Sequence, residues 1–278
     1  MTYDVFFAVL GAALLHAAWN ALVKVSADRL VVLAIMMAGQ AVFALLALPF
    51  VEIPPAAAWP NIAMSTVLHT GYFLLLISAY RFGDLSHVYP LARGVAPLIV
   101  ALVATFVAGE VLGTQATVAV LLIALGIMSL MLARGVEGFR EPRAVACALA
   151  TGLFIAGYTI VDGLGARQAG SAHSYILWLN VFNGMPTIVL ALVMRRGQVR
   201  QQVRKVWKIG ALSGVVSLLA YWIALWAMTQ APLAFVSAVR ETGMVFAVLF
   251  GVFFLKERLD LARLASTFVT LLGTVLLK

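Results

Sequence analysis

The chain has 278 residues, of which 64% are hydrophobic and only 11% are charged. Soluble proteins carry roughly 45–50% apolar and about 25% charged residues, so a soluble fold of this size would leave much apolar surface unburied. The composition therefore excludes a soluble enzyme, a nucleic-acid-binding domain and a disordered protein. A net charge of +8 in a membrane chain points first to cytoplasmic loops, where Lys and Arg concentrate. The single cysteine, Cys147, excludes a disulfide framework and a cysteine metal cluster.

Ten runs of the chain are long and apolar enough to cross a bilayer, which takes about 20 residues in a helix. The predicted helices are 4–24, 30–50, 61–80, 85–108, 114–133, 143–163, 173–194, 208–229, 232–255 and 260–277. Most separators are too short to hold an extramembrane domain, so we expect one all-α membrane body. The first run lacks a basic leader and a cleavage site, and we expect it to be a permanent helix.

The distribution of Lys and Arg predicts the orientation. Fifteen of the 19 basic residues follow odd-numbered helices and two lie on the opposite side, while Arg93 and Arg240 fall within helices. Because basic loops stay in the cytoplasm, both chain ends are predicted on the non-cytoplasmic side of a bacterial inner membrane.

The ten helices divide evenly around a polar linker. We expect a first five-helix repeat at 1–135, a cytoplasmic linker at 136–142 and a second repeat at 143–278. Five spans per half make the second half enter the membrane from the opposite side. The prediction is therefore two inverted repeats around a central cavity.

The two halves also share rare charges in one register. An ungapped alignment of the halves places Arg93 over Arg240 and Glu110 over Glu257. Few charges occur within the apolar runs, so this coincidence favours a duplicated architecture.

Several motifs resemble those of the EamA-type drug/metabolite transporter superfamily, and together they cover essentially the whole chain. They are PLARGVAP at 90–97 with FVAGE at 106–110, SAVRE at 237–241 with FLKERL at 254–259, and WNALVK at 19–24. The resemblance implies ten helices in two inverted five-helix repeats and export of metabolites or drugs through a central cavity. Amino-acid exporters are one branch of that superfamily.

Charged residues at membrane depth need a partner or a wet cavity, because each costs about 2.5–3.5 kcal/mol at the bilayer centre. Arg93 and Arg240 are the strongest candidates to meet a carboxylate or phosphate, although each could instead bond to carbonyl groups of the bundle. Glu241 points about 100° away from Arg240, so we expect no simple pair between them; it could bind protons or cap a helix. Asp162 is a coupling candidate or an interfacial residue. His16 is a titrating group or a packing residue.

Aromatic and polar side chains occupy several of the predicted helices. The candidates for binding the solute are Trp19, Asn20, His69, Tyr72, Tyr89, Tyr158, Trp222, Trp226 and Ser237. The 173–194 and 208–229 runs also carry Asn180, Asn183 and Tyr221. An aromatic-lined cavity with a few polar anchors suits an amphipathic organic solute, whereas ordinary helix packing and interfacial aromatic belts remain alternatives.

Two prolines, Pro90 and Pro97, bracket Arg93. Proline removes an intrahelical hydrogen bond and produces a kink, so we expect a moving part beside the site or a static kink fixed by packing.

The sequence predicts a carrier that exports small organic metabolites by alternating access, with neutral or aromatic amino acids favoured. A proton-coupled multidrug exporter is the main alternative, followed by a membrane-embedded enzyme. Motifs of hydrolases, zinc proteases and nucleotide-binding loops are absent, so we expect neither an enzyme nor a cofactor or metal. The expected partners are a small-molecule substrate and the lipid bilayer, with no nucleic acid, and the protein is predicted to be a monomer or a homodimer.

Overall fold

The computed structural model describes residues 1–26, 28–82, 85–132, 142–195, 197–253 and 261–277, without the side chains of 76–89 and 131–132. The described residues form helices and connecting turns, with no strand among them. The α-helices are α1 (Tyr3–Lys24), α2 (Arg29–Ala47), α3 (Trp59–Phe82), α4 (Leu85–Val107), α5 (Thr114–Leu132), α6 (Pro142–Gln168), α7 (Ala172–Met194), α8 (Val199–Gln230), α9 (Leu233–Arg240), α10 (Gly243–Phe253) and α11 (Leu261–Leu276). Two 3-10 turns, η1 (Leu48–Phe50) and η2 (Ala56–Ala58), join α2 to α3.

Most predicted spans coincide with a helix, because each is a continuous apolar run of sufficient length. Two differ. The span predicted at 208–229 begins at Val199, since the preceding residues 199–207 contain neither Gly nor Pro and continue the helix. The span predicted at 232–255 is divided into α9 and α10. The proposed linker at 136–142 lies almost wholly outside the described residues, so the predicted boundary between two repeats stays a prediction.

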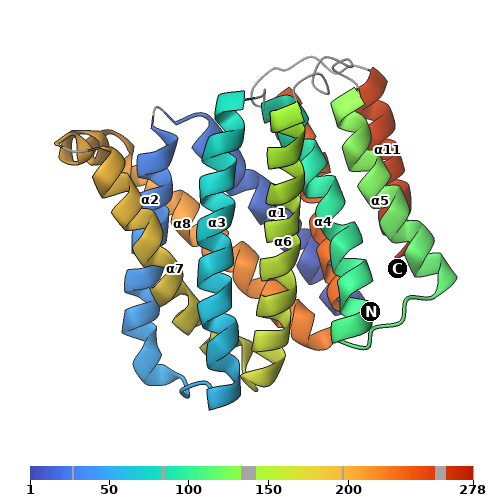
Figure 1. The fold of residues 1–278 in the computed structure, drawn as a ribbon, viewed down its shortest axis with the longest axis horizontal. Coiled ribbons are helices and arrows are strands. Elements are labelled where there is room, and N and C mark those ends of the chain that lie inside the picture. The colour runs from blue at the N-terminus through green and yellow to red at the C-terminus, as the bar shows by residue number, and fades with distance from the viewer. Residues whose placement is uncertain (27, 83–84, 133–141, 196, 254–260, 278) are drawn as a thin grey trace.

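The helices lie side by side in a bundle (Figure 1). Helices α3 and α4 both pack against α6, α1 packs against α8, and α2 packs against α7 and α8. Helix α5 pairs with α11 at one edge of the bundle in Figure 1. The start of α5 contacts the end of α11, where the Gln115 side chain donates a hydrogen bond to the Leu276 carbonyl at 2.9 Å.

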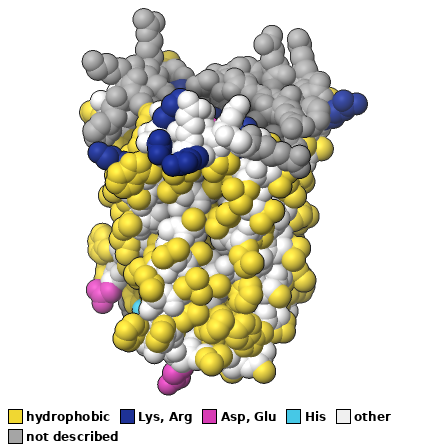
Figure 2. Space-filling view, turned by 90° about the vertical axis from the view of Figure 1, so that its left-hand side faces the viewer, with side chains coloured by type: hydrophobic (Ala, Val, Ile, Leu, Met, Phe, Trp, Pro, Cys, Tyr) yellow, Lys and Arg dark blue, Asp and Glu magenta, His cyan; other side chains and the backbone are white. Residues whose placement is uncertain are grey.

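The outside of the bundle is suited to a bilayer. Seven of the described helical spans have at least 18 residues and enough hydropathy to cross a membrane, and two further apolar helices are shorter. Large apolar side chains such as Phe106 and Phe268 are exposed on the flanks. Figure 2 shows apolar side chains over the flank and Lys and Arg gathered at one end. The chain is therefore a multi-pass membrane protein.

We call the Lys- and Arg-rich end, where α1 ends at Lys24 and α8 begins at Val199, the basic end of the bundle. The opposite end, where α6 ends at Gln168 and α7 begins at Ala172, is called the far end.

The break between α9 and α10 falls at Glu241 and Thr242, in the middle of an apolar run. The Glu241 N–H donates to the Ala238 carbonyl at 3.0 Å, a tight i→i+3 bond that ends α9. The Thr242 hydroxyl donates to the Val239 carbonyl at 2.7 Å, in competition with the helical ladder. Gly243 then crosses α1, where a Cβ atom would lie 3.1 Å from the Ala13 carbonyl oxygen. The break thus places Arg240 and Glu241 at the end of a helix inside the bundle.

Helices α4 and α6 approach closely at Gly152. A Cβ atom at that position would lie 2.8 Å from the Ala92 carbonyl oxygen, so no larger residue fits without a shift. Small residues allow such contacts between membrane helices, and here the contact fixes the residue that precedes Arg93.

Candidate functional site

A cavity of about 630 Å³ extends from the middle of the bundle to the basic end. Its inner part is lined by His16, Trp19, Asn20, His69, Tyr72, Arg93, Tyr158, Asn180, Asn183, Tyr221 and Arg240. At the basic end the lining reaches Ser26, Asp28 and Arg195. Pockets of this size and mixed lining hold small organic ligands in many proteins.

The two arginines predicted for the site both line the cavity, but their surroundings differ. Arg93 of α4 lies 2.8 Å from the Glu241 carboxylate, measured from Nε to Oε2, and both side chains are about 5% exposed or less. Glu241 ends α9, so the ion pair joins α4 to the helix break. The positive charge of Arg93 is therefore balanced within the protein.

Arg240 forms no ion pair of this kind among the described residues. Within these parts of the chain, no carboxylate oxygen lies within 4 Å of its guanidinium. The guanidinium lies over the ring of Tyr221 at 5.5 Å from the ring centre, a cation–π contact that leaves the planar donor edge available. Of the two arginines, Arg240 is the one suited to meet an anionic group in the cavity.

Aromatic rings form one wall beside Arg240. His69 of α3 stacks on Tyr158 of α6 with the ring centres 4.1 Å apart, and Tyr72 meets Tyr158 edge to face at 6.0 Å. On α1, His16 and Trp19 meet edge to face at 5.1 Å. Aromatic pairs of these geometries hold the rings in place and present apolar faces to a solute.

Amide groups supply polar contacts at the same depth. The Asn20 side chain donates to the His16 carbonyl at 2.8 Å, and that of Asn180 donates to the Ile176 carbonyl at 2.7 Å. The Oδ1 atom of Asn183 and the indole N–H of Trp19 are shielded from solvent and have no hydrogen-bond partner among the residues that the structure describes. A buried polar atom without a partner costs about 1–3 kcal/mol, so a bound solute that contacts these atoms would remove a penalty.

Asp162 lies behind the cavity wall and is completely buried. Tyr175 donates to one carboxylate oxygen at 2.9 Å, and Tyr221 donates to the other. The ring of Tyr175 fits against α6 because residue 165 is glycine; a Cβ atom there would lie 2.4 Å from the ring. Asp162 thereby fixes Tyr221, the ring on which Arg240 rests.

Three of the described candidates for binding the solute do not line the cavity. Trp222 lies one residue beyond Tyr221, about 100° further round α8, and its indole donates to His173 at 2.6 Å. Trp226 packs against the hydrophobic core, and Ser237 is buried within α9. Tyr221 lies on the same helix and lines the cavity, so it is a better candidate than Trp222 or Trp226 for contact with the solute.

The remaining candidates lie on α4. Pro90 and Pro97 lie within that helix, which is continuous over Leu85–Val107, and neither lines the cavity. The side chain of Tyr89 lies outside the described residues.

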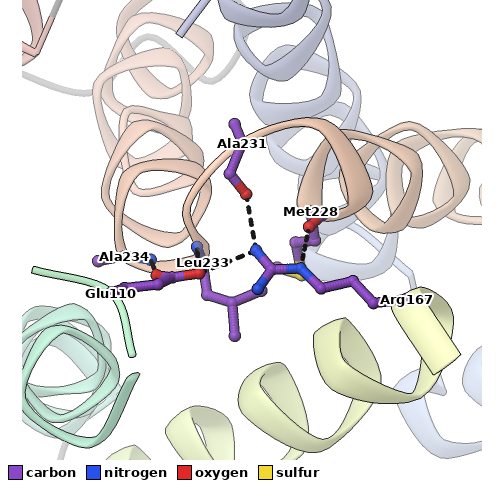
Figure 3. A network of polar contacts seen from close by, with 6 residues as sticks. All are labelled: Glu110, Arg167, Met228, Ala231, Leu233 and Ala234. Atoms are coloured by element: carbon purple, nitrogen blue, oxygen red, sulfur yellow. Dashed lines mark hydrogen bonds and ion pairs between the residues drawn. The ribbon is translucent and has the colours of Figure 1, made fainter. Parts of the chain in front are cut away.

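The far end is held by the network in Figure 3. Arg167 at the end of α6 contacts Glu110 at 2.8 Å and donates to the carbonyls of Met228 and Ala231 at 2.8 and 2.9 Å. Glu110 also accepts from the Leu233 N–H at 2.9 Å, at the start of α9. A carboxylate is favourable at a helix N-terminus, and this one joins α6, α8, α9 and the end of α4.

An ion pair lies at the mouth of the cavity, at the basic end. Arg195, after α7, donates to the Asp28 carboxylate at 2.8 Å, and Asp28 also accepts from the Val31 N–H at 3.2 Å as the N-cap of α2. Burial raises the pKa of Asp28, but these hydrogen bonds and the nearby Arg195 charge outweigh it and hold the pKa below its ordinary value. The pair therefore stays ionised at neutral pH.

The fold and the cavity define a multi-pass membrane protein that encloses a solute-sized chamber. The family model described as the EamA-like transporter family matches residues 142–278, and this match supports the EamA-type drug/metabolite transporter superfamily. The match also supports a membrane transporter of small molecules.

Solved structures agree with this fold. One, described only as a crystal structure of a protein, superimposes with a TM-score of 0.78 over 99% of this chain and 98% of the other, at 15% sequence identity. That identity is low, so the likeness shows the fold alone. No curated protein matches the sequence.

Proposed function

We propose that the protein is a carrier that exports small organic metabolites, in particular neutral or aromatic amino acids, by alternating access. The observation that carries the proposal is Arg240, whose guanidinium faces a cavity with aromatic walls and has no carboxylate partner in the described residues. A carboxylate would bind the planar donor edge of Arg240. The solute side chain would then lie against Tyr72 and Tyr158.

The charges of the cavity favour this solute over a cationic drug. A cation needs an accessible acidic group, and among the described lining residues the only carboxylate is Asp28. That carboxylate is bound to Arg195, Glu241 is bound to Arg93, and Asp162 lies behind Tyr221. Among the described residues, a cationic drug would therefore find no free acidic group in the cavity.

Alternating access is supported by the different states of the two ends. The cavity reaches the basic end, while the network of Glu110 and Arg167 ties the far end together. Movement of α9 away from that network would open the far end, and the helix break after Arg240 would couple this movement to the site. Inverted repeats would relate the two openings, and the proposed orientation places the basic end in the cytoplasm of a bacterial inner membrane.

Uptake of labelled leucine and phenylalanine into proteoliposomes tests the proposal. We expect Arg240→Ala to lose most of the uptake and Arg240→Lys to retain part of it, since lysine keeps the charge but not the donor fork. Arg143→Ala is the matched control, because Arg143 is exposed and does not line the cavity. Full uptake by Arg240→Ala would overturn the carboxylate contact, and absence of transport by the wild type would overturn the choice of solute.

A further inference from the structure

The first turns of α8 carry a stripe of positively charged side chains. Arg200, Arg204 and Lys208 are spaced four residues apart, so they lie along one face of the helix, and all three are exposed. Trp207 lies on the same face, 52% exposed, with the Lys208 ammonium 5.8 Å from its ring centre. None of these cations has a carboxylate within 4 Å in the described residues. No Asp or Glu occurs between Asp162 and Glu241 in the sequence.

Helix α8 is long enough for this segment to extend past the hydrocarbon region. Helix α8 has 32 residues and is about 48 Å long, whereas the hydrocarbon core of a bilayer is about 30 Å thick. The stripe therefore lies at the depth of lipid headgroups. An exposed tryptophan among cations is typical of that layer.

An apolar groove of about 150 Å³ lies beside the stripe. Its walls come from α2, α7 and the start of α8, and small side chains on α2 and α7 leave the space. The groove-lining residues that matter here are Ala34, Ala38, Ala191, Leu192, Val199 and Val203. Val199 and Val203 alternate with Arg200 and Arg204 along α8. The groove therefore begins at headgroup depth and continues toward the bilayer interior.

We propose that this corner of the bundle is a binding site for one anionic phospholipid. The headgroup phosphate contacts Arg200 and Arg204, and an acyl chain lies in the groove between α2, α7 and α8. Charge complementarity selects the anionic lipid, because neither Arg200 nor Arg204 has a carboxylate within 4 Å among the described residues. The site is independent of the cavity and of the solute.

Lys205 provides a matched control within the same turn. It carries the same charge and is also exposed, but it lies about 100° from Arg204, on the side of α8 turned away from Val199 and Val203. Each cation near an anionic lipid surface contributes about 1 kcal/mol, which corresponds to a roughly fivefold change in affinity.

Native mass spectrometry of the full chain, purified in detergent and titrated with phosphatidylglycerol or phosphatidylcholine, tests the site. We expect a phosphatidylglycerol adduct on the wild type, about fivefold weaker binding for Arg200→Gln and for Arg204→Gln, and less than twofold change for Lys205→Gln. Ala38→Leu, which narrows the groove, should also weaken the adduct. Unchanged thermal unfolding of each variant would separate these losses from misfolding.

Brominated phosphatidylglycerol gives a second readout, because bromine quenches nearby indoles. The quenching that arises from Trp207 is the part that is lost in Trp207→Phe. This part should reach saturation as brominated phosphatidylglycerol is added, and it should be smaller in Arg204→Gln. The proposal is overturned by equal binding of phosphatidylcholine, by equal losses in Lys205→Gln, or by displacement of the lipid by glycerol 3-phosphate alone. A dimer mass that disappears with Trp207→Phe, without a lipid adduct, would assign the face to a second copy of the chain and also overturn it.

Discussion

Arg93 and Glu241 form a buried ion pair across the bundle, with 2.8 Å between Nε and Oε2. The pair joins the first half of α4 to the end of α9, where the chain changes direction before α10. Two charges that would each be costly in a membrane are thus placed together, and they hold the helix break beside Arg240.

Removal of one partner of this pair should be strongly destabilising. Glu241→Gln leaves the Arg93 guanidinium buried without its counter-charge, and loss of one partner of a buried pair costs about 3–5 kcal/mol. The double variant Arg93→Gln with Glu241→Gln should recover much of that loss, because no uncompensated charge remains. Thermal unfolding in detergent measures both. Equal stability of the wild type and Glu241→Gln would contradict the pairing.

The ion pair at the cavity mouth should respond to pH. The pKa of Asp28 is depressed in the folded protein, so its contribution to stability is complete above the unfolded value of about 3.9 and is lost as the pH falls through the folded value. Asp28→Asn keeps an N-cap for α2 but removes the charge, so its deficit relative to the wild type should vanish at low pH. Asp28→Ala loses the cap as well, at a further cost of about 1 kcal/mol. Unfolding temperatures from pH 7 to pH 3 separate the two effects; a deficit of Asp28→Asn that is constant across this range would show that the ion pair does not contribute.

Much of the fold follows from composition, because nothing but a spanning helix accommodates an apolar run of about 20 residues in a bilayer. The division of the run at 232–255 could not be predicted in this way. The run is apolar on both sides of Glu241, and the break depends on the contact of Gly243 with α1 and of Glu241 with α4. Both contacts are tertiary and leave no local pattern.

From the sequence, the candidate site could be predicted only where a residue type is rare in its surroundings, such as a charge within an apolar run. Arg93 and Arg240 could be selected because a charge within an apolar run needs a reason. Which of them is neutralised depends on the packing of α4 against α9, and that packing is not encoded in either helix alone. Likewise, Tyr221 and Trp222 differ only by their position round α8, and the face that meets the cavity is set by the contacts of α8 with α1 and α2.

Two glycines of α6 should respond differently to alanine. At Gly152 a Cβ atom would lie 2.8 Å from the Ala92 carbonyl oxygen, so Gly152→Ala should push α4 away and cost about 1–3 kcal/mol. At Gly157 the nearest atoms, on Leu68, are 3.5 Å away, an ordinary contact. Gly157→Ala should therefore be neutral or stabilise by up to about 1 kcal/mol through helix propensity. Thermal unfolding decides, and similar effects of both variants would argue against the close approach of α4 and α6.

The far-end network should control access to the cavity from that side. Glu110→Gln removes the charge that holds both Arg167 and the start of α9, a charge-assisted contact worth about 1.5–3 kcal/mol. If this contact closes the far end, its loss should raise the population of the open form about tenfold or more. The readout is the reaction of an impermeant maleimide with a thiol introduced by Ser237→Cys, in a Cys147→Ala background. Ser237 is 5% exposed in α9, so the wild-type network should keep this labelling slow.

Asn61→Ala is the control for this experiment, because Asn61 donates to Gln168 at 2.8 Å at the same end of the bundle without contacting α9. It should leave the labelling rate within about twofold, as expected for loss of one exposed hydrogen bond. Arg167→Lys should give an intermediate rate, since an ammonium can contact Glu110 but cannot also reach both carbonyls in the fixed geometry of a guanidinium. Equal labelling of Glu110→Gln and Asn61→Ala would mean that α9 is held by packing alone, and the network would then have no part in opening the cavity.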